Sequence, residues 1–288
     1  MHIRGIDGRG EGRVRVPTNP LQASLEKLDD FGDQLSLYGR SIAWIPRTLR
    51  RYRREVARLL AEVSFGSGAL VVILGTAGVM AGLSLFVGSV VGLQGFRALD
   101  ALGTEALTGF VTAYFNTRDI APLVASQAVI CTLGAGYTAE LGAMRISEEI
   151  DALEAMSVPS VPFLISTRVI AGFIAIIPLY TIGLIMSYAA ARFNVTAIQG
   201  LPGGTYDHYF ELFLPVDDVL WSYLKVLAFT FVIILVCCHY GYRAGGGPAG
   251  VGIAVGRAVR ASIVLVAVVD FFLTLAIFGT ATSVRVAG

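Results

Sequence analysis

Four ionisable residues interrupt stretches of the sequence that are otherwise apolar: Arg118, Asp119, Lys225 and Asp270. On insertion scales, an ionised side chain at the centre of a membrane span costs about 2.5–3.5 kcal/mol, so such residues should face the protein interior and be paired. We predict a local pair between Arg118 and Asp119, and a contact between Lys225 and Asp270. These pairs could lock the helices together, or they could sense a lipid headgroup or relay closure. In an ion-coupled transporter the same acids would relay protons.

A second charged segment, residues 146–157, has a different pattern. Ser147 precedes Glu148 and Glu149, and both a serine cap and acids in the first turn favour the start of a helix. The pattern therefore predicts a short helix, capped by Ser147 and ended by the prolines at 159 and 162. One face is apolar (Ile146, Ile150, Leu153 and Met156), and acids occupy the rest (Glu148, Glu149, Asp151 and Glu154). Such a helix could dock its apolar face into a groove on a separate motor subunit, or it could be a solvated connection.

The sequence carries little that could perform covalent or metal chemistry. Residues 134–139 match a dinucleotide-binding pattern, but the run before them is long enough for a bilayer and is not a strand. No phosphate-binding loop occurs, so we expect no ATP hydrolysis by this chain. His208 and His239 have no ligand partners near them in sequence, and we expect no metal site. The three cysteines lie in apolar runs and are interpreted as core residues: Cys131, Cys237 and Cys238. A lipid-modifying membrane enzyme would need a nucleophile or metal cluster that the sequence does not offer.

The elements that must position these residues are membrane helices. Hydrophobic residues make up 55% of the chain and charged residues 15%, against about 25% charged in soluble proteins, and the mean hydropathy is +0.70. The net charge of +1 gives no reason to expect nucleic acid as a partner. We therefore predict an all-α integral membrane protein. A span needs about 20 apolar residues, and five stretches qualify: Val63–Phe96, Ala106–Ala139 (one long or broken helix), Val169–Ala191, Val219–Cys238 and Ile253–Gly279.

The distribution of Lys and Arg predicts the orientation of these spans. Of the 22 basic residues, 12 lie in the first 60 positions, whereas residues 193–218 contain four acids and no Lys or Arg. We therefore expect a multi-pass protein of the inner (plasma) membrane with a cytoplasmic N-terminus and an extracytoplasmic C-terminus. Residues 1–34 match no pattern, and we expect a disordered cytoplasmic extension there.

Residues 35–64, before the first span, contain arginines at helical spacing: Arg47, Arg51, Arg54 and Arg58. The opposite side of this segment is apolar. The pattern predicts a basic amphipathic helix that lies in the headgroup layer with its arginines toward anionic lipid. The alternative is a basic tail that only obeys the positive-inside rule.

Glycines spaced four apart within the spans predict close approach of helix backbones, within the chain or across a dimer. The pairs are Gly78 and Gly82, Gly88 and Gly92, and Gly252 and Gly256. The alternative is the ordinary glycine content of membrane helices.

A family resemblance lies in residues 139–153, which read AELGAMRISEEIDAL. This segment resembles the signature of the MlaE/YrbE permease family, whose E-E-x-D-A motif marks a coupling helix. Three other segments are similar to that family: residues 92–96, residues 118–122 (with Asp and Ala where the family has Glu and Gly), and residues 269–274. The likeness extends over about residues 35–282, with a permease domain at 65–282. The E-E-I-D-A-L form and the arginine-rich helix resemble actinobacterial YrbE permeases associated with Mce proteins.

The resemblance implies the membrane subunit of an ATP-driven lipid transporter. It implies two permease chains, identical or paralogous, around an apolar cavity, with two cytoplasmic ATPases that hold ATP and Mg, so that this chain binds no cofactor itself. MCE-domain proteins would sit on the outer side, and fatty acids, sterols or related lipids would be imported. The ATPase-coupling residues would be Glu140, Arg145, Glu148, Glu149, Ile150, Asp151, Leu153 and Met156. Two alternatives remain: an ion-coupled secondary transporter, which predicts an internal repeat that five spans do not offer, and a scaffold within a heterodimer.

Overall fold

The computed structural model of the chain describes residue 39, residues 54–58 and residues 69–279. The expectation of a disordered extension at 1–34, and the arginines at 47 and 51, lie outside these residues. Throughout the described part the secondary structure is helical, as predicted. Residues 54–58 form a helical segment in which Arg54 and Arg58 are exposed and Val56 is buried, but five residues do not test the predicted interfacial helix.

Five helices in the described part are long and apolar enough to cross a membrane, which confirms the predicted number of spans. The second is a single continuous helical run, Glu105–Ile146, so the predicted polar break does not separate two helices. Its turns alternate between α- and π-type segments: α4 (Thr108–Val111), η2 (Thr112–Ile120), α5 (Ala121–Val129), η3 (Ile130–Gly134) and α6 (Ala135–Ile146). The other spans are built on α3 (Ala69–Asp100), α8 (Thr167–Phe193), α10 (Val216–Tyr242) and α11 (Gly247–Phe278).

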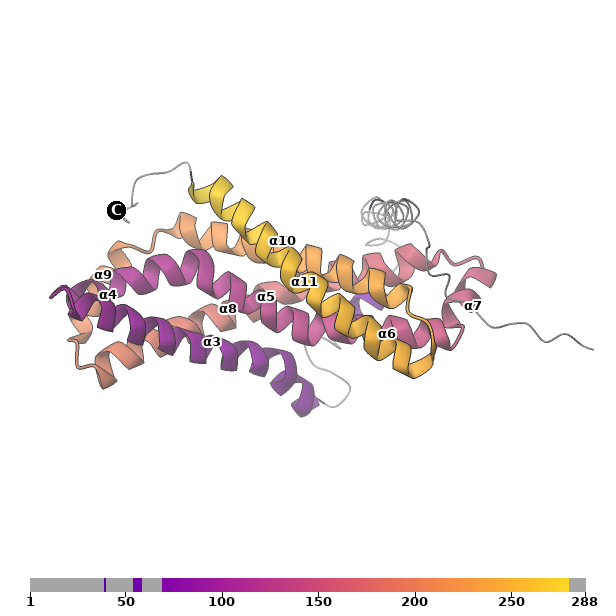
Figure 1. The fold of residues 1–288 in the computed structure, drawn as a ribbon, viewed down its shortest axis with the longest axis horizontal. Coiled ribbons are helices and arrows are strands. Elements are labelled where there is room, and N and C mark those ends of the chain that lie inside the picture. The colour runs from indigo at the N-terminus through magenta and orange to yellow at the C-terminus, as the bar shows by residue number, and fades with distance from the viewer. Residues whose placement is uncertain (1–38, 40–53, 59–68, 280–288) are drawn as a thin grey trace, which may run out of the picture.

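The short helices lie at opposite ends of an elongated bundle (Figure 1). At one end, α7 (Glu149–Ala155) follows α6 near the turn between α10 and α11. At the other end, α9 (Gly203–Leu212) lies near α4. The side chain of Arg192 at the end of α8 fixes α9 through two hydrogen bonds to Asp207, 2.7 and 2.8 Å long, and these hold the pKa of the Asp207 carboxyl below its ordinary range.

The predicted close approach of helix backbones is confirmed for one glycine pair. A Cβ added to Gly88 would lie 2.2 Å from the backbone oxygen of Ser187, and one added to Gly92 would lie 2.9 Å from that of Ala191. These glycines let α3 and α8 touch backbone to backbone. In contrast, a Cβ at Gly82, Gly252 or Gly256 would meet nothing within 4 Å, so these three do not serve packing inside the described chain. Gly78 is half-buried.

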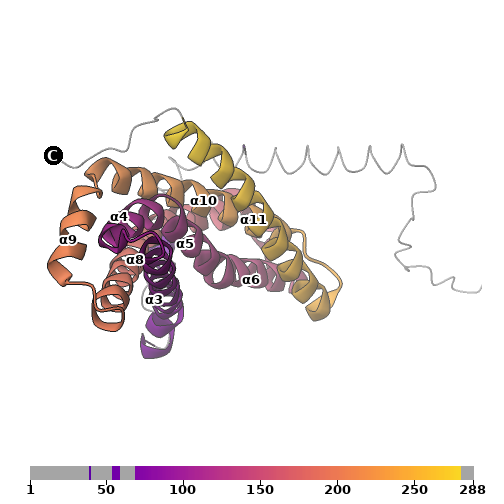
Figure 2. The ribbon, with the colours of Figure 1, turned by 60° about the vertical axis from the view of Figure 1, so that its left-hand side comes forward.

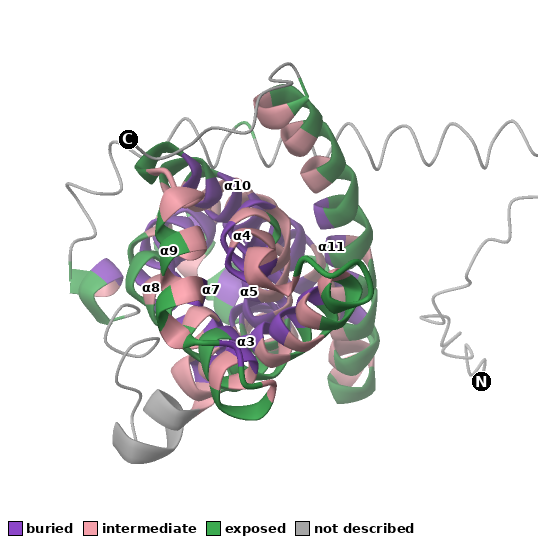
Figure 3. Cartoon of the chain, turned by 90° about the vertical axis from the view of Figure 1, so that its left-hand side faces the viewer, coloured by how far each residue is buried: buried purple, intermediate pink, exposed green. Residues whose placement is uncertain are grey.

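Helix α11 lies on the outside of the bundle (Figures 2 and 3). It is buried along one stripe of small residues at four-residue spacing: Ala254, Ala258, Ser262 and Val266. The remaining faces carry exposed apolar side chains, among them Val264, Phe271 and Phe272. The core of the molecule lies instead between α6, α8 and α10, where side chains such as Ile176, Phe229 and Ile233 are fully buried.

Candidate functional site

A buried lysine connects three of the spans in the half of the bundle nearer α9. Lys225 is fully buried, and its Nζ lies 2.9 Å from an Asp119 carboxylate oxygen and 2.7 Å from Asp270. Nζ also donates to the Thr274 hydroxyl at 2.9 Å, and that hydroxyl donates to Asp119 at 3.1 Å. The contact between Lys225 and Asp270 confirms the predicted pair; it is an ion pair whose angles fall outside those of a hydrogen bond.

The predicted pair between Arg118 and Asp119 is wrong. The Arg118 guanidinium instead forms two contacts with the Asp218 carboxylate, 2.8 Å from Nε and 2.7 Å from Nη2, while Asp119 turns to Lys225. Neighbouring residues on a helix point in different directions, so adjacent opposite charges do not face each other. The guanidinium also lies over the Tyr114 ring at 3.9 Å, which places the positive charge against the negative face of an aromatic ring.

A proline explains why a lysine is needed at this position. In a regular α-helix the carbonyl of Arg118 would accept from the N–H of residue 122, but residue 122 is Pro and has no N–H. An unpaired carbonyl inside a membrane span costs several kcal/mol. Arg118 lies in the π-type segment η2, and Lys225 Nζ donates to its carbonyl at 2.8 Å, so the lysine supplies a side-chain donor beside Pro122 as well as neutralising carboxylates.

Sequence reasoning missed two members of this network. Asp218 is 3% exposed in the first turn of α10, but in the sequence it lies among acids expected in an outer loop. Thr274 carries no charge, and a threonine in a span gives no signal by itself. The sequence does hold a clue to Asp218. Once Arg118 and Asp119 are placed on different faces of their helix, Arg118 needs another buried acid as its partner.

The acidic segment forms α7, but Ser147 does not cap it. Ser147 ends α6, and its hydroxyl donates to the carbonyl of Ala143 at 3.0 Å. Glu148 then adopts a left-handed backbone (φ 60°), and α7 begins at Glu149, so the helix is shorter than the predicted 146–157. The reversal of direction between two helices in so few residues requires a left-handed residue, and the serine hydroxyl contacts the Ala143 carbonyl and the Glu149 carboxylate instead of a backbone N–H of α7.

The apolar face of α7 packs against its own chain. Ile150 is fully buried, so its side chain is not available to a motor subunit, and Leu153 is half-buried against the main core. Met156 is the member of the predicted apolar face that stays exposed, at 66%. The expectation that this face supplies anchors for a partner is therefore wrong for Ile150, which the bundle covers completely, whereas Leu153 stays partly exposed.

The acids of α7 fall into two groups. Asp151 accepts from Arg145 Nη1 at 2.6 Å, and Glu154 accepts from the Ser160 hydroxyl at 2.6 Å, so both bind the chain itself. Glu148, directly before α7, and Glu149 are exposed; the Glu149 carboxylate accepts from the Ser147 hydroxyl at 2.9 Å, and the described residues give the Glu148 side chain no hydrogen bond or ion pair. The outward face of α7 is consequently negative.

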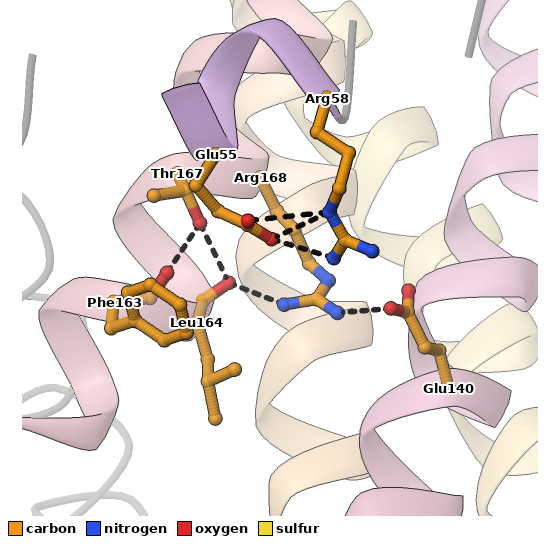
Figure 4. A network of polar contacts seen from close by, with 7 residues as sticks. All are labelled: Glu55, Arg58, Glu140, Phe163, Leu164, Thr167 and Arg168. Atoms are coloured by element: carbon orange, nitrogen blue, oxygen red, sulfur yellow. Dashed lines mark hydrogen bonds and ion pairs between the residues drawn. The ribbon is translucent and has the colours of Figure 1, made fainter. Parts of the chain in front are cut away.

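A further ion pair joins the spans on either side of α7. Arg168 in α8 is 3% exposed, with Nη2 2.8 Å from the Glu140 carboxylate in α6 and Nη1 2.7 Å from the carbonyl of Leu164. Figure 4 shows these contacts together with the ion pair between Glu55 and Arg58 in the segment before the first span. Arg58 Nη2 lies 2.6 Å from Glu55 Oε1. Glu140, whose side chain is 39% exposed, therefore links α6 to α8 through Arg168.

Taken together, five long apolar helices with charges paired between them, and a short acidic helix at one end, define a polytopic helical membrane protein. No group of three or more metal-ligating side chains occurs in the described part of the chain. The sequence model of the family described as Permease MlaE matches residues 65–276. The chain therefore belongs to the MlaE permease family, and it is a membrane permease subunit.

Individual relatives agree with this membership. A probable ABC transporter permease protein of Rickettsia bellii is 30% identical over 68% of this chain and 76% of its own length. One from Synechocystis is 27% identical over 67% of this chain and 73% of its own. The chloroplastic protein TRIGALACTOSYLDIACYLGLYCEROL 1 of Arabidopsis thaliana is 29% identical over 66% of this chain and 55% of its own.

Proposed function

We propose that this chain is the permease subunit of an ATP-driven lipid importer of the inner membrane, and that α7 is where a cytoplasmic ATPase docks. The observation that carries the proposal is the outward face of α7: Glu148, Glu149 and Met156 are exposed on a helix whose other side is fixed to the bundle. Two acids steer a basic groove into register, and one exposed methionine adapts to an apolar pocket. ATP and Mg are held by the partner.

The apolar faces of α11 support a second permease chain as partner. Gly252 and Gly256 have open space over them and are flanked by the exposed side chain of Ile253. Small residues at this spacing allow a second helix to approach closely in lipid. Identical or paralogous copies joined along this side would enclose the apolar cavity that a lipid requires.

Lipid as the substrate class is supported by the family and by a relative. The Arabidopsis relative carries the name of a glycolipid built on diacylglycerol. Fatty acids, sterols or related lipids as cargo, MCE-domain proteins on the outer side, and the actinobacterial YrbE type follow from the resemblance in residues 139–153. The proposed orientation puts α7 in the cytoplasm and α9 outside, with the N-terminus cytoplasmic and the C-terminus extracytoplasmic. An ion-coupled transporter is less well supported, because Lys225 already holds both Asp119 and Asp270.

Co-purification tests the proposal. The tagged chain would be extracted from its host membrane in detergent, and its partners identified by mass spectrometry, for the native chain and for Glu148→Lys/Glu149→Lys. We expect a P-loop ATPase with the native chain and its loss from the double variant. A double reversal at exposed acids of the opposite end, Asp100→Lys/Glu211→Lys, is the matched control and should retain the ATPase. Recovery of no ATPase with the native chain would refute the proposal.

A further inference from the structure

Three side chains from separate parts of the fold meet beneath α7. The hydroxyl of Ser160, in the connection to the third span, donates to Glu154 Oε1 at 2.6 Å. The hydroxyl of Tyr242, the last residue of α10, donates to the same oxygen at 3.2 Å. The two hydroxyl oxygens are 2.9 Å apart, so either hydroxyl can donate to the other while that one donates to Glu154, and the three groups form one cluster.

The neighbouring acid of α7 extends this cluster to α6. Asp151, three residues before Glu154 and so on the same side of the helix, accepts from Arg145 Nη1 at 2.6 Å. The Arg145 guanidinium lies 6.0 Å from the centre of the Tyr242 ring, within reach of a cation–π contact. We call Arg145, Asp151, Glu154, Ser160 and Tyr242 the Tyr242 node. The node attaches the inward side of α7 to α6 and α10 at once, while the outward acids stay free of it.

Helix α10 leads directly from the Tyr242 node to the buried network. It is uninterrupted from Tyr242 back to Lys225, about 26 Å at 1.5 Å per residue. Lys225 contacts α11 through Asp270 and the second span through Asp119. A helix satisfies its backbone internally and moves as a unit, so a displacement of one end reaches the other. Thus the Tyr242 node lies at one end of α10, and Lys225 lies 17 residues back along the same uninterrupted helix.

We infer that the Tyr242 node is the positioning contact through which a motor acting on α7 moves α10, and with it Lys225 and the helices that Lys225 holds. The inference rests on the proposed function. Tyr242 acts as a positioning residue, because its hydroxyl fixes the position of α7 relative to α10. The tyrosine ring alone, without the hydroxyl, would leave α7 attached to α6 by Arg145 but released from α10.

The test reports on α10 itself, in the assembled transporter reconstituted into phospholipid vesicles. A spin label would be attached at Leu224→Cys, an exposed position beside Lys225, in a Cys131→Ala background; Cys237 and Cys238 are buried. The label spectrum would be recorded without nucleotide and after trapping with ATP and vanadate. We expect a nucleotide-dependent change in the parent chain and its loss in Tyr242→Phe, with ATP hydrolysis and the amount of bound ATPase retained.

Matched variants separate the hydrogen bonds from general damage. Tyr240→Phe removes a hydroxyl two residues away for which the described residues offer no hydrogen-bond partner, and it should leave the response intact. Glu154→Gln keeps an acceptor oxygen and should retain the nucleotide-dependent change of the label spectrum, whereas Glu154→Leu should lose that change. Tyr242→Phe/Glu154→Leu should be no worse than either single change, because both break one unit.

Three other results would overturn the inference about the Tyr242 node. A label response that survives in Tyr242→Phe and Glu154→Leu overturns the inference, and so does a parent chain whose label is insensitive to nucleotide. Loss of the ATPase itself from Tyr242→Phe also overturns it, because the residue would then serve docking. These results leave the permease proposal standing, whereas the absence of any ATPase from the parent complex refutes that proposal instead.

Discussion

Replacing Lys225 by methionine removes the one cation that holds three spans together. The change leaves the carboxylates of Asp119 and Asp270 without the ammonium that now lies 2.9 and 2.7 Å away. It also leaves the carbonyl of Arg118 without its 2.8 Å donor. Methionine fills a similar volume, so the loss is of charge and hydrogen bonds and not of packing.

The magnitude follows from these contacts. Breaking a buried ion pair by removing one partner costs about 3–5 kcal/mol, and an unsatisfied buried carbonyl about 1–3 kcal/mol. These terms overlap, and the Asp119 side chain is 38% exposed, so its share is reduced by solvent. We therefore expect Lys225→Met to lower the free energy of unfolding by about 3–5 kcal/mol.

The assay is titration of the detergent-solubilised protein with sodium dodecyl sulfate, followed by far-ultraviolet circular dichroism. Adding Asp119→Asn and Asp270→Asn to Lys225→Met should restore more than half of the loss, because neutral amides carry no stranded charge. Arg260→Met, on an exposed face of α11, is the control and should change little. A cost below about 1 kcal/mol for Lys225→Met, or a triple variant no more stable than the single one, would refute the reasoning.

Exchanging the charges of Lys225 and Asp270 should not restore the native stability. In Lys225→Asp/Asp270→Lys, the new aspartate would face Asp119 and the carbonyl of Arg118, which both need a donor or a cation. We now expect only partial recovery from this swap.

Two further predictions concern the packing of α3 and the end of the bundle near α9. Gly88→Ala should destabilise the protein strongly, because the new methyl would lie 2.2 Å from the Ser187 carbonyl oxygen, whereas Gly256→Ala, with nothing within 4 Å, should be neutral for the isolated chain; the same detergent titration distinguishes them. Asp207, whose pKa is lowered by Arg192, should contribute stability that is present above the ordinary carboxyl pKa and lost as the pH falls through its lowered value. Asp207→Asn should flatten that acidic limb of the melting temperature against pH, and an unchanged profile would contradict the assignment.

The spans could be predicted because their signal is local. Each long apolar run in the sequence became a membrane-length helix, and the contact of Lys225 with Asp270 followed from the need to pair two isolated charges. The partner of Arg118 could not be found in this way. It lies 100 residues along the chain, in a helical turn that local sequence assigns to a loop.

The sequence predicted that α7 is a short acidic helix, but it did not predict which face of the helix points outward. The amphipathic pattern identified the helix, yet the pattern does not say which surface covers the apolar stripe. The bundle itself covers Ile150 and part of Leu153, so the outward face is defined by what is left over, Glu148, Glu149 and Met156. Likewise, the link between Glu154 and Tyr242 joins residues 88 apart, and no periodicity reports on it.

The ionic network also has a consequence for the insertion of the spans into the membrane during synthesis. Asp119 enters the bilayer with the second span, but Lys225 follows 106 residues later. At 5–20 residues per second, the interval is about 5–20 s. Throughout that time, Arg118 and Asp119 have no partner. An ionised residue at mid-span costs about 2.5–3.5 kcal/mol. The charges of the second span therefore stay unpaired until α10 is inserted, and a chain that stops before α10 keeps them unpaired.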